Sequence, residues 1–308
     1  MLDLIIWIGV FVVALIVLIK AADYFTDSAE KIGLFFGMSS FVVGITIVAL
    51  GTSIPELATS IVAVFRNASE IVIGDVVGSN ITNILLVIGA AGVLSGGIIL
   101  KHKFSRTNKT LFIGSALLLV LFSIDRFIEP YEAAVLFCLY ILYIAMLVRQ
   151  NNHNEKSKVA LGWKPVITLI LSVAAIYFGA EYVIKSVVMI SKLAKIGADV
   201  IAAGAIALGT SLPELVVSVT AVRKNKHDMA VGNIIGSNIF NILMVVGISG
   251  LFAPLLVTET MAVFGMIFMA VATVIFLVFL RDMKIERWEG IILLILYITF
   301  ILKLFGVF

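Results

Sequence analysis

Long apolar stretches recur along nearly the whole chain, and they constrain its fold more than any other feature. A helix needs about 20 mainly apolar residues to cross a bilayer. Charged residues make up only 13% of the 308 residues, whereas soluble domains carry roughly a quarter. The sequence therefore predicts an all-α integral membrane protein and excludes a soluble enzyme. Ten predicted transmembrane spans run approximately over 3–22, 38–64, 70–95, 110–124, 131–149, 163–190, 198–222, 229–253, 259–280 and 288–307.

Basic residues between these spans predict the orientation of the protein. If both chain ends lie outside, the inner connections carry 15 lysines and arginines and the outer connections carry 4. This excess follows the positive-inside rule, so we expect both termini on the outer side of the cytoplasmic membrane. The first span lacks a basic leader and a small-residue cleavage site, which favours a retained helix over a signal peptide.

A long internal repeat divides the chain into two halves. Residues 42–89 align with residues 200–247 at a constant offset of 158, without gaps and with 23 identities in 48 pairs. Each copy belongs to a set of five spans, and an odd number turns the second copy upside down. We therefore expect two inverted five-helix repeats, joined by a short cytoplasmic linker. The expected boundaries are 1–150 for the first repeat, 151–162 for the linker and 163–308 for the second repeat.

Glu56 and Glu214 are the acids that lie deepest within the predicted spans, and they are repeat mates. A charge at the centre of a membrane helix costs about 2.5–3.5 kcal/mol by insertion scales, so such residues usually have a function. Each glutamate follows a proline, Pro55 or Pro213. Because proline removes a backbone donor, we expect a kinked or broken helix that exposes carbonyl oxygens beside each carboxylate.

Helical spacing gathers further oxygen atoms around these glutamates. Side chains three and four residues apart share one face of a helix. Two carboxylates and about eight neutral oxygens would suit a hard cation, since Ca²⁺ takes 6–8 oxygen ligands. The same oxygens can hold Na⁺, and competition for shared ligands is a simple basis for antiport. The neutral candidates are Thr52, Ser53, Ser79 and Asn83 in the first repeat and Thr210, Ser211, Ser237 and Asn241 in the second.

The motifs that carry these residues resemble the calcium/cation antiporter superfamily, within its prokaryotic sodium/calcium exchanger group. They are GTSIPEL with GSNITN in the first half, and GTSLPEL with GSNIFN in the second. The resemblance covers essentially the whole chain. It implies exchange of Na⁺ against Ca²⁺ by alternating access, in which the first and sixth helices slide against the rest.

By motif position, the resemblance implies that Glu56 and Glu214 are shared Ca²⁺ and Na⁺ ligands and that the eight neutral residues complete the centre. Some exchangers carry aspartate where Asn241 stands. The predicted centre of this chain therefore has a total charge of −2, whereas theirs is −3. This departure leaves the Na⁺ stoichiometry open. The alternatives are an H⁺/Ca²⁺ or a K⁺-dependent Na⁺/Ca²⁺ antiporter, although GTSxPE and Glu214 favour neither.

Three further acids are expected at helix ends or vestibules. Asp75 stands where its repeat mate is Asn233, and we expect a helix-start or vestibule residue there. Asp23 and its mate Glu181 are expected to be helix-end or hinge anchors.

Other classes of function receive little support from the sequence. No histidine lies in a predicted span, so an intramembrane enzyme would lack a base for its nucleophile. A channel stays open as an alternative. We expect no cofactor and no nucleic acid, we infer no protein partner, and we expect Ca²⁺, Na⁺ and membrane lipid as the interacting species.

Overall fold

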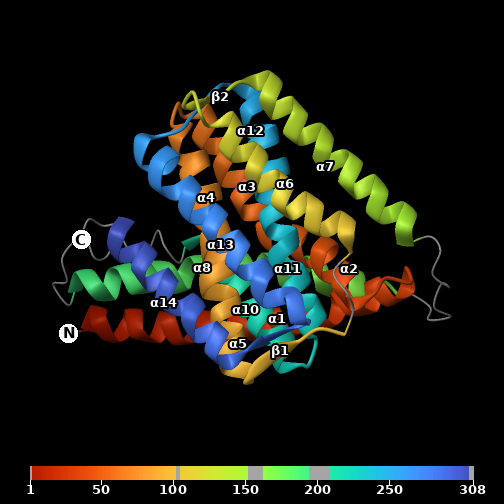
Figure 1. Ribbon diagram of the computed structural model, residues 1–308. Helices are drawn as coiled ribbons and strands as arrows, with labels where there is room; N and C mark the ends of the chain where they lie inside the picture. Colours follow the sequence, from red (N-terminus) through yellow and green to blue (C-terminus); the bar gives the residue numbers. More distant parts are fainter. Residues whose placement is uncertain (1, 102–104, 152–161, 194–208, 305–308) are drawn as a thin grey trace.

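The computed structural model describes residues 2–101, 105–151, 162–193 and 209–304, and helices dominate it (Figure 1). The first half contains α1 (Leu2–Phe35), α2 (Ser40–Val43), α3 (Ala49–Phe65), α4 (Glu70–Thr82), α5 (Gly89–Ser95), α6 (Arg106–Phe122) and α7 (Pro130–Asn151). The second half contains α8 (Trp163–Leu193), α10 (Leu212–Arg223), α11 (His227–Phe240), α12 (Gly247–Phe252), α13 (Met266–Phe279) and α14 (Arg287–Leu304).

Short π-helical or 3₁₀ segments link several of these helices into longer rods. The π segment η1 joins α2 to α3, η2 joins α4 to α5, and η3 joins α11 to α12. The linking segments are η1 (Gly44–Val48), η2 (Asn83–Ile88), η3 (Asn241–Val246), η4 (Met261–Gly265) and the 3₁₀ turn η5 (Leu280–Asp282). Within the described residues, seven helices or linked rods are long and apolar enough to cross a membrane.

The helices agree with the predicted ten-span membrane fold. Two predicted spans outside the seven correspond to α6, which has 17 residues, and to α14, which carries charges near both ends. The predicted span 198–222 is described only from residue 209 onward, where it ends as α10. The predicted linker 151–162 lies almost wholly outside the described residues.

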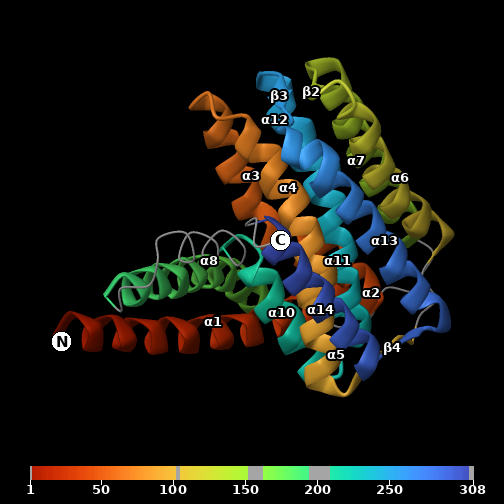
Figure 2. The same cartoon turned by 60° about the vertical axis from the view of Figure 1, so that its left-hand side comes forward.

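Two short strand pairs, which the sequence analysis did not predict, join the two halves. β1 (Gly97–Ile99) pairs with β4 (Lys284–Glu286), and β2 (Phe127–Ile128) pairs with β3 (Leu255–Leu256), both antiparallel. At the repeat offset of 158, β1 matches β3 and β2 matches β4. The pairs lie at opposite ends of the helix bundle (Figures 1 and 2). This arrangement is what an inverted repeat requires, because one two-fold operation exchanges the two ends.

The long helices α1 and α8 lie side by side and cross the other helices at a steep angle (Figure 2). Their close approach depends on Gly179, where an added Cβ would lie 3.1–3.3 Å from Leu18. On the other side, α1 contacts α3 where the ring of Phe25 fills the space beside Gly51. The pair therefore packs against the segment that carries the first glutamate motif.

The two proline motifs fold differently, which corrects part of the expectation. Helix α3 continues through Pro55 without a break. In the second copy a turn at Thr210 and Ser211 precedes α10, so Pro213 occupies the first turn of a helix. Proline is tolerated there because its missing N–H would have no partner in any case. The expectation was a kinked or broken helix: the turn before α10 agrees with it for the second motif, and for the first motif the helix is not broken at Pro55.

Glycines allow α11 to cross η1 at backbone contact. A Cβ added to Gly236 would lie 2.5 Å from the Ile45 carbonyl oxygen and 2.6 Å from the Ala49 Cβ. A Cβ on Gly232 would lie 2.5 Å from the Phe41 carbonyl oxygen. Small residues at this spacing are a common device for close helix packing in membranes. The crossing brings the serine and asparagine motif of α11 against the first glutamate motif.

Gly236→Ala should lower the thermal unfolding temperature in detergent, because the methyl group meets backbone that cannot rotate away. Overpacking of this kind costs about 1–3 kcal/mol. Gly114→Ala on α6 is the matched control, since nothing lies within 4 Å of its added Cβ. Equal unfolding temperatures for the two variants would contradict the proposed crossing.

Candidate cation-binding site

The two motif glutamates meet in the interior of the helix bundle. Glu56 on α3 is 1% exposed, and Glu214 in the first turn of α10 is fully buried. The Ser53 hydroxyl of the first half donates to Glu214 Oε1 of the second half at 3.1 Å. The two carboxylates are close enough to repel each other electrostatically. The fold thus brings both charges, which are 158 residues apart in sequence, to one centre.

Much of the hydrogen-bonding capacity at this centre is unused. Both carboxylate oxygens of Glu56 and the Oε2 atom of Glu214 are buried without a hydrogen-bond partner among the described residues. The Asn83 Oδ1 atom and both polar side-chain atoms of Asn241 are in the same state. Neither glutamate forms an ion pair within the described part of the chain. Buried charge is costly unless it is paired, and no group among the described residues pairs with these oxygens.

Hydroxyl groups from both halves surround the glutamates in symmetric pairs. Ser79 Oγ lies 2.9 Å from Thr210 Oγ1, and Thr52 Oγ1 lies 3.5 Å from Ser237 Oγ. These two contacts are repeat equivalents, because Ser79 matches Ser237 and Thr52 matches Thr210. Each contact joins one half of the protein to the other. Ser211, the mate of Ser53, is also buried.

The asparagine candidates stand where two helices change their geometry. Asn83 begins η2 and Asn241 begins η3, so the π segments are repeat equivalents. Single π turns occur frequently at functional sites, because they redirect backbone groups that a regular helix would pair internally. Asn83 Nδ2 donates to Asn238 Oδ1 at 3.0 Å. All ten predicted ligand residues lie in the interior of the protein, with only Thr210 partly exposed.

Asn80 and Asn238 are functional candidates that the sequence analysis missed. Asn80 Nδ2 donates to the Asn238 carbonyl oxygen at 3.3 Å, and Asn238 Nδ2 donates to the Asn80 carbonyl oxygen at 3.2 Å. The two residues are repeat mates, so the pair lies on the pseudo-two-fold axis. The sequence signal for this pair is that asparagine stands at the same position of both repeats. The pair fixes the contact between the two halves beside the glutamates.

The three further acids have different surroundings. Asp75 is partly exposed and lies on α4, one turn before Ser79. Asp23 pairs with Lys224 at 3.4 Å, whereas its mate Glu181 is exposed. Asp23 and Glu181 lie well inside the long helices α1 and α8, so the expectation of helix-end positions is wrong for both.

An ion-pair cluster, also missed, ties α1 to the loop between α10 and α11. Lys224 Nζ lies 2.9 Å from Asp27 Oδ1, and Lys226 Nζ lies 2.9 Å from Asp27 Oδ1 and 3.0 Å from Glu30 Oε2. The acids at 23, 27 and 30 follow helical spacing, which was the signal for one charged face. This cluster links α1 to the loop that follows α10, the helix that carries Glu214.

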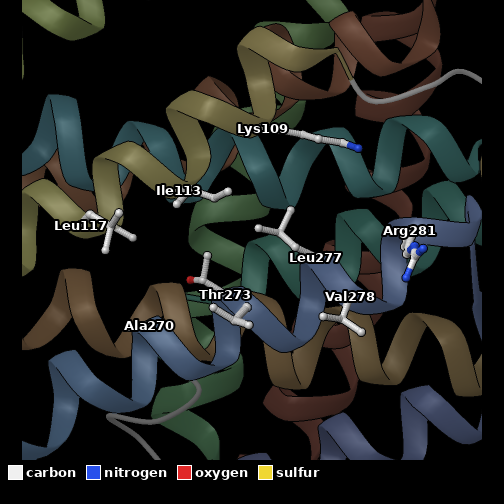
Figure 3. A pocket seen from close by; sticks show the side chains of 10 residues that line it. Lys109, Ile113, Leu117, Ala270, Thr273, Leu277, Val278 and Arg281 are labelled. Carbon is white, nitrogen blue, oxygen red and sulfur yellow. The ribbon is translucent and has the colours of Figure 1, made fainter.

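A groove between α6 and α13 is separate from the glutamate centre. It has a volume of about 400 Å³ and its walls are mainly apolar, with Lys109 and Arg281 among its lining residues (Figure 3). None of the motif residues lines it. Apolar walls with basic residues nearby are typical of a surface that faces lipid.

Two buried carboxylates, paired hydroxyls from both halves and an inverted repeat of membrane helices are together typical of a membrane transporter for cations. Comparison with known proteins agrees. The family described as "Sodium/calcium exchanger protein" matches residues 6–149 and 164–306, and the chain belongs to this family.

Relatives cover nearly the full length of the chain. The sodium/calcium exchanger MaX1 of Methanosarcina acetivorans is 36% identical over 96% of this chain and 97% of its own length. The inner membrane protein YrbG of Escherichia coli is 31% identical over 80% of each chain. A solved structure of the sodium-calcium exchanger NCX_Mj superimposes with a TM-score of 0.85 at 33% identity, covering 98% of this chain and 99% of that one. The fold is thus the ten-helix exchanger fold.

Replacing Asn80 or Asn238 by alanine should destabilise the fold by about 1–3 kcal/mol, because each change leaves a buried carbonyl without its donor. The double variant should cost about the sum of the two single variants, since each substitution removes a different one of the two bonds. Thermal or denaturant unfolding in detergent measures the three variants. No loss of stability in either single variant would contradict these bonds between the two halves.

Proposed function

We propose that the protein is a secondary active antiporter that exchanges Na⁺ for Ca²⁺ across the cytoplasmic membrane by alternating access. The inward Na⁺ gradient drives Ca²⁺ extrusion. The relatives described as sodium/calcium exchangers support this choice of ions. Chemistry on the transported ions is unnecessary, so the protein acts as a transporter and not as an enzyme.

The observation that carries the proposal is the uncompensated charge of Glu56 and Glu214. Their free oxygens are buried inside the bundle, far from bulk water, and no cationic side chain among the described residues pairs with them. An unpaired charge in such a place is unfavourable by several kcal/mol. One Ca²⁺ or two Na⁺ would neutralise the pair, and neither set fits while the other is bound. Mutual exclusion of this kind couples the two ion flows.

The surrounding residues have complementary roles in this proposal. Glu56 and Glu214 bind either cation set. The hydroxyls of Thr52, Ser53, Thr210, Ser211, Ser79 and Ser237 and the amides of Asn83 and Asn241 supply neutral oxygens. Hard cations favour such ligands over nitrogen or sulfur. Asp23 anchors α1 through its ion pair with Lys224.

Residues 1–150 and 163–308 act as two inverted halves joined by the linker 151–162. The family matches over 6–149 and 164–306 support this division. The excess of basic residues in alternate loops places both termini outside. The β1–β4 end then faces the cytoplasm, and the β2–β3 end faces outward. Membrane lipid covers the apolar flanks, including the groove between α6 and α13.

Glu56→Gln and Glu214→Gln should each reduce Na⁺-dependent Ca²⁺ uptake into proteoliposomes by about ten- to a hundredfold. Glutamine keeps the shape of glutamate but removes its charge. The loss of one charged ligand is worth about 1.5–3 kcal/mol. Each 1.4 kcal/mol weakens binding of the ion tenfold. The measurement is ⁴⁵Ca²⁺ flux with Na⁺, K⁺ and H⁺ gradients imposed separately.

Glu70→Gln is the matched control for these variants, because Glu70 is an exposed acid at the start of α4. Its flux should equal that of the unchanged protein. Flux that follows a pH gradient without Na⁺ would select H⁺/Ca²⁺ exchange, and a requirement for K⁺ would select the K⁺-dependent class. Normal flux in both glutamine variants would refute the site.

The ion-pair cluster should restrain α1 during alternating access. Replacing Lys224 and Lys226 together by glutamine should increase deuterium uptake of the inner part of α1, because each partly exposed pair contributes about 0.2–1 kcal/mol. Hydrogen-exchange mass spectrometry measures this directly. Arg223→Gln at the end of α10 is the control, since Arg223 is exposed. Unchanged uptake in the double variant would show that the cluster does not hold α1.

A further inference from the structure

The groove between α6 and α13 lies between two helices that are repeat mates. At the repeat offset of 158, residues 108–121 of α6 match residues 266–279, which are the whole of α13. Ala116 and its mate Val274 both line the groove. The two-fold operation that exchanges the halves of the protein therefore exchanges the two walls of the groove and also its two ends. A difference between these ends comes from the sequence and not from the fold.

The interior of the groove suits a hydrocarbon chain. Ile113 and Leu117 line it one helical turn apart on α6, and both are exposed. Thr273 is its uncharged polar lining residue, and the Thr273 hydroxyl already donates to the Met269 carbonyl oxygen at 2.8 Å. The volume of about 400 Å³ lies in the range of small-ligand sites. An apolar chain would fill this space without depriving a polar group of its partner.

Two basic residues mark one end of this groove. Lys109 of α6 and Arg281 of η5 lie at the same end, with Leu117 toward the other (Figure 3). At the repeat offset their mates are Ile267 and Ser123, and neither of these carries a charge. Both basic residues are exposed, and Arg281 has no ion-pair partner among the described residues. No described residue that lines the groove is acidic, so its charged end attracts an anion.

The charged end lies where lipid headgroups are expected. Arg281 stands three residues before β4, so this is the β1–β4 end of the bundle. Trp288, at the start of α14, is 54% exposed, and its ring centroid lies 6.1 Å from that of Phe279 at the end of α13. Exposed tryptophans gather at the interface between hydrocarbon and water. In the orientation proposed above, this end faces the cytoplasm, and the cytoplasmic leaflet is the one that carries anionic lipids.

We propose that this groove binds one anionic phospholipid of the cytoplasmic leaflet. An acyl chain lies between α6 and α13, while Lys109 and Arg281 hold the phosphate of the headgroup. Arginine offers phosphate a planar fork of donors, and lysine adds a compact charge. Basic pockets between transmembrane helices on the cytoplasmic side bind such headgroups. Phosphatidylcholine shares the phosphate but carries a positive choline group, which the same two residues repel. The choice of leaflet rests on the proposed orientation, and the choice of an anionic headgroup does not.

Native mass spectrometry of the purified full chain counts bound lipid molecules and tests the site. The protein in neutral detergent is titrated with phosphatidylglycerol or with phosphatidylcholine of the same acyl chains. Phosphatidylglycerol should occupy one site more tightly than phosphatidylcholine. The double variant Lys109→Gln with Arg281→Gln should weaken phosphatidylglycerol binding by about thirtyfold, the combined effect of two basic residues near a headgroup. The double variant Arg149→Gln with Arg223→Gln is the matched control, because both residues are exposed and neither lines the groove. It should keep the tight binding.

A second variant tests the apolar part of the groove and leaves the charges in place. Ala270→Phe should fill the space for the acyl chain and weaken phosphatidylglycerol binding by about tenfold, because less hydrocarbon is then buried. Val271→Phe is its control, since Val271 is 50% exposed on the same helix and does not line the groove. The rise of the thermal unfolding temperature with added phosphatidylglycerol measures the same occupancy. That rise should be lost in Ala270→Phe and kept in Val271→Phe.

Equal binding of the two lipids by the unchanged protein would overturn the proposal, because the headgroup charge would then not be recognised. Unchanged phosphatidylglycerol binding in the double variant of Lys109 and Arg281 would overturn it as well. Equally tight binding of soluble glycerol phosphate would show a phosphate site that needs no groove, and would also count against a lipid site. These measurements involve no ion flux. A failure of Na⁺/Ca²⁺ exchange in transport assays would therefore leave this inference standing.

Discussion

The unpaired negative charge of two buried glutamates is the constraint on which the rest of this structure depends. Glu56 and Glu214 lie where water is excluded, and three of their four carboxylate oxygens have no hydrogen-bond partner in the described chain. A soluble protein would pair such groups or leave them exposed. In a membrane bundle, acids at such positions usually line the path of a substrate or an ion. The proposed exchange of cations gives these two carboxylates the charged partners that the protein itself does not supply.

The inverted repeat supplies the geometry that one chain segment cannot. Reciprocal bonds between Asn80 and Asn238, and the mated contacts of Ser79 with Thr210 and Thr52 with Ser237, all cross from one half to the other. No half contains a complete site. Because the two-fold operation exchanges the ends of the bundle, it presents nearly the same ligands toward both sides of the membrane. This property suits a centre that must open alternately to each side.

Sequence patterns predicted the ten spans and the inverted halves, because hydropathy, loop charge and the repeat are all local or periodic signals. The strand pairs were not predicted, since β1–β4 and β2–β3 each involve only two or three residues from distant loops. Helix α3 runs unbroken through Pro55, whereas a turn precedes Pro213 in the second motif. The two motifs are nearly identical in sequence, so no count of prolines reveals this difference.

Departures from symmetry matter as much as the symmetry itself. At the β1–β4 end, Lys224 and Lys226 hold the acids of α1, and Asn233 closes the centre with a satisfied amide. At the β2–β3 end the repeat mate of Lys226 is Ala68, and the mate of Asn233 is the partly exposed Asp75. The β1–β4 end therefore holds α1 by ion pairs. Helix α8 cannot repeat this cluster, because the repeat mates of Asp27 and Glu30 are Lys185 and Val188. The sequence differences between the halves thus make the two ends of the bundle unequal, although the fold that carries them is symmetric.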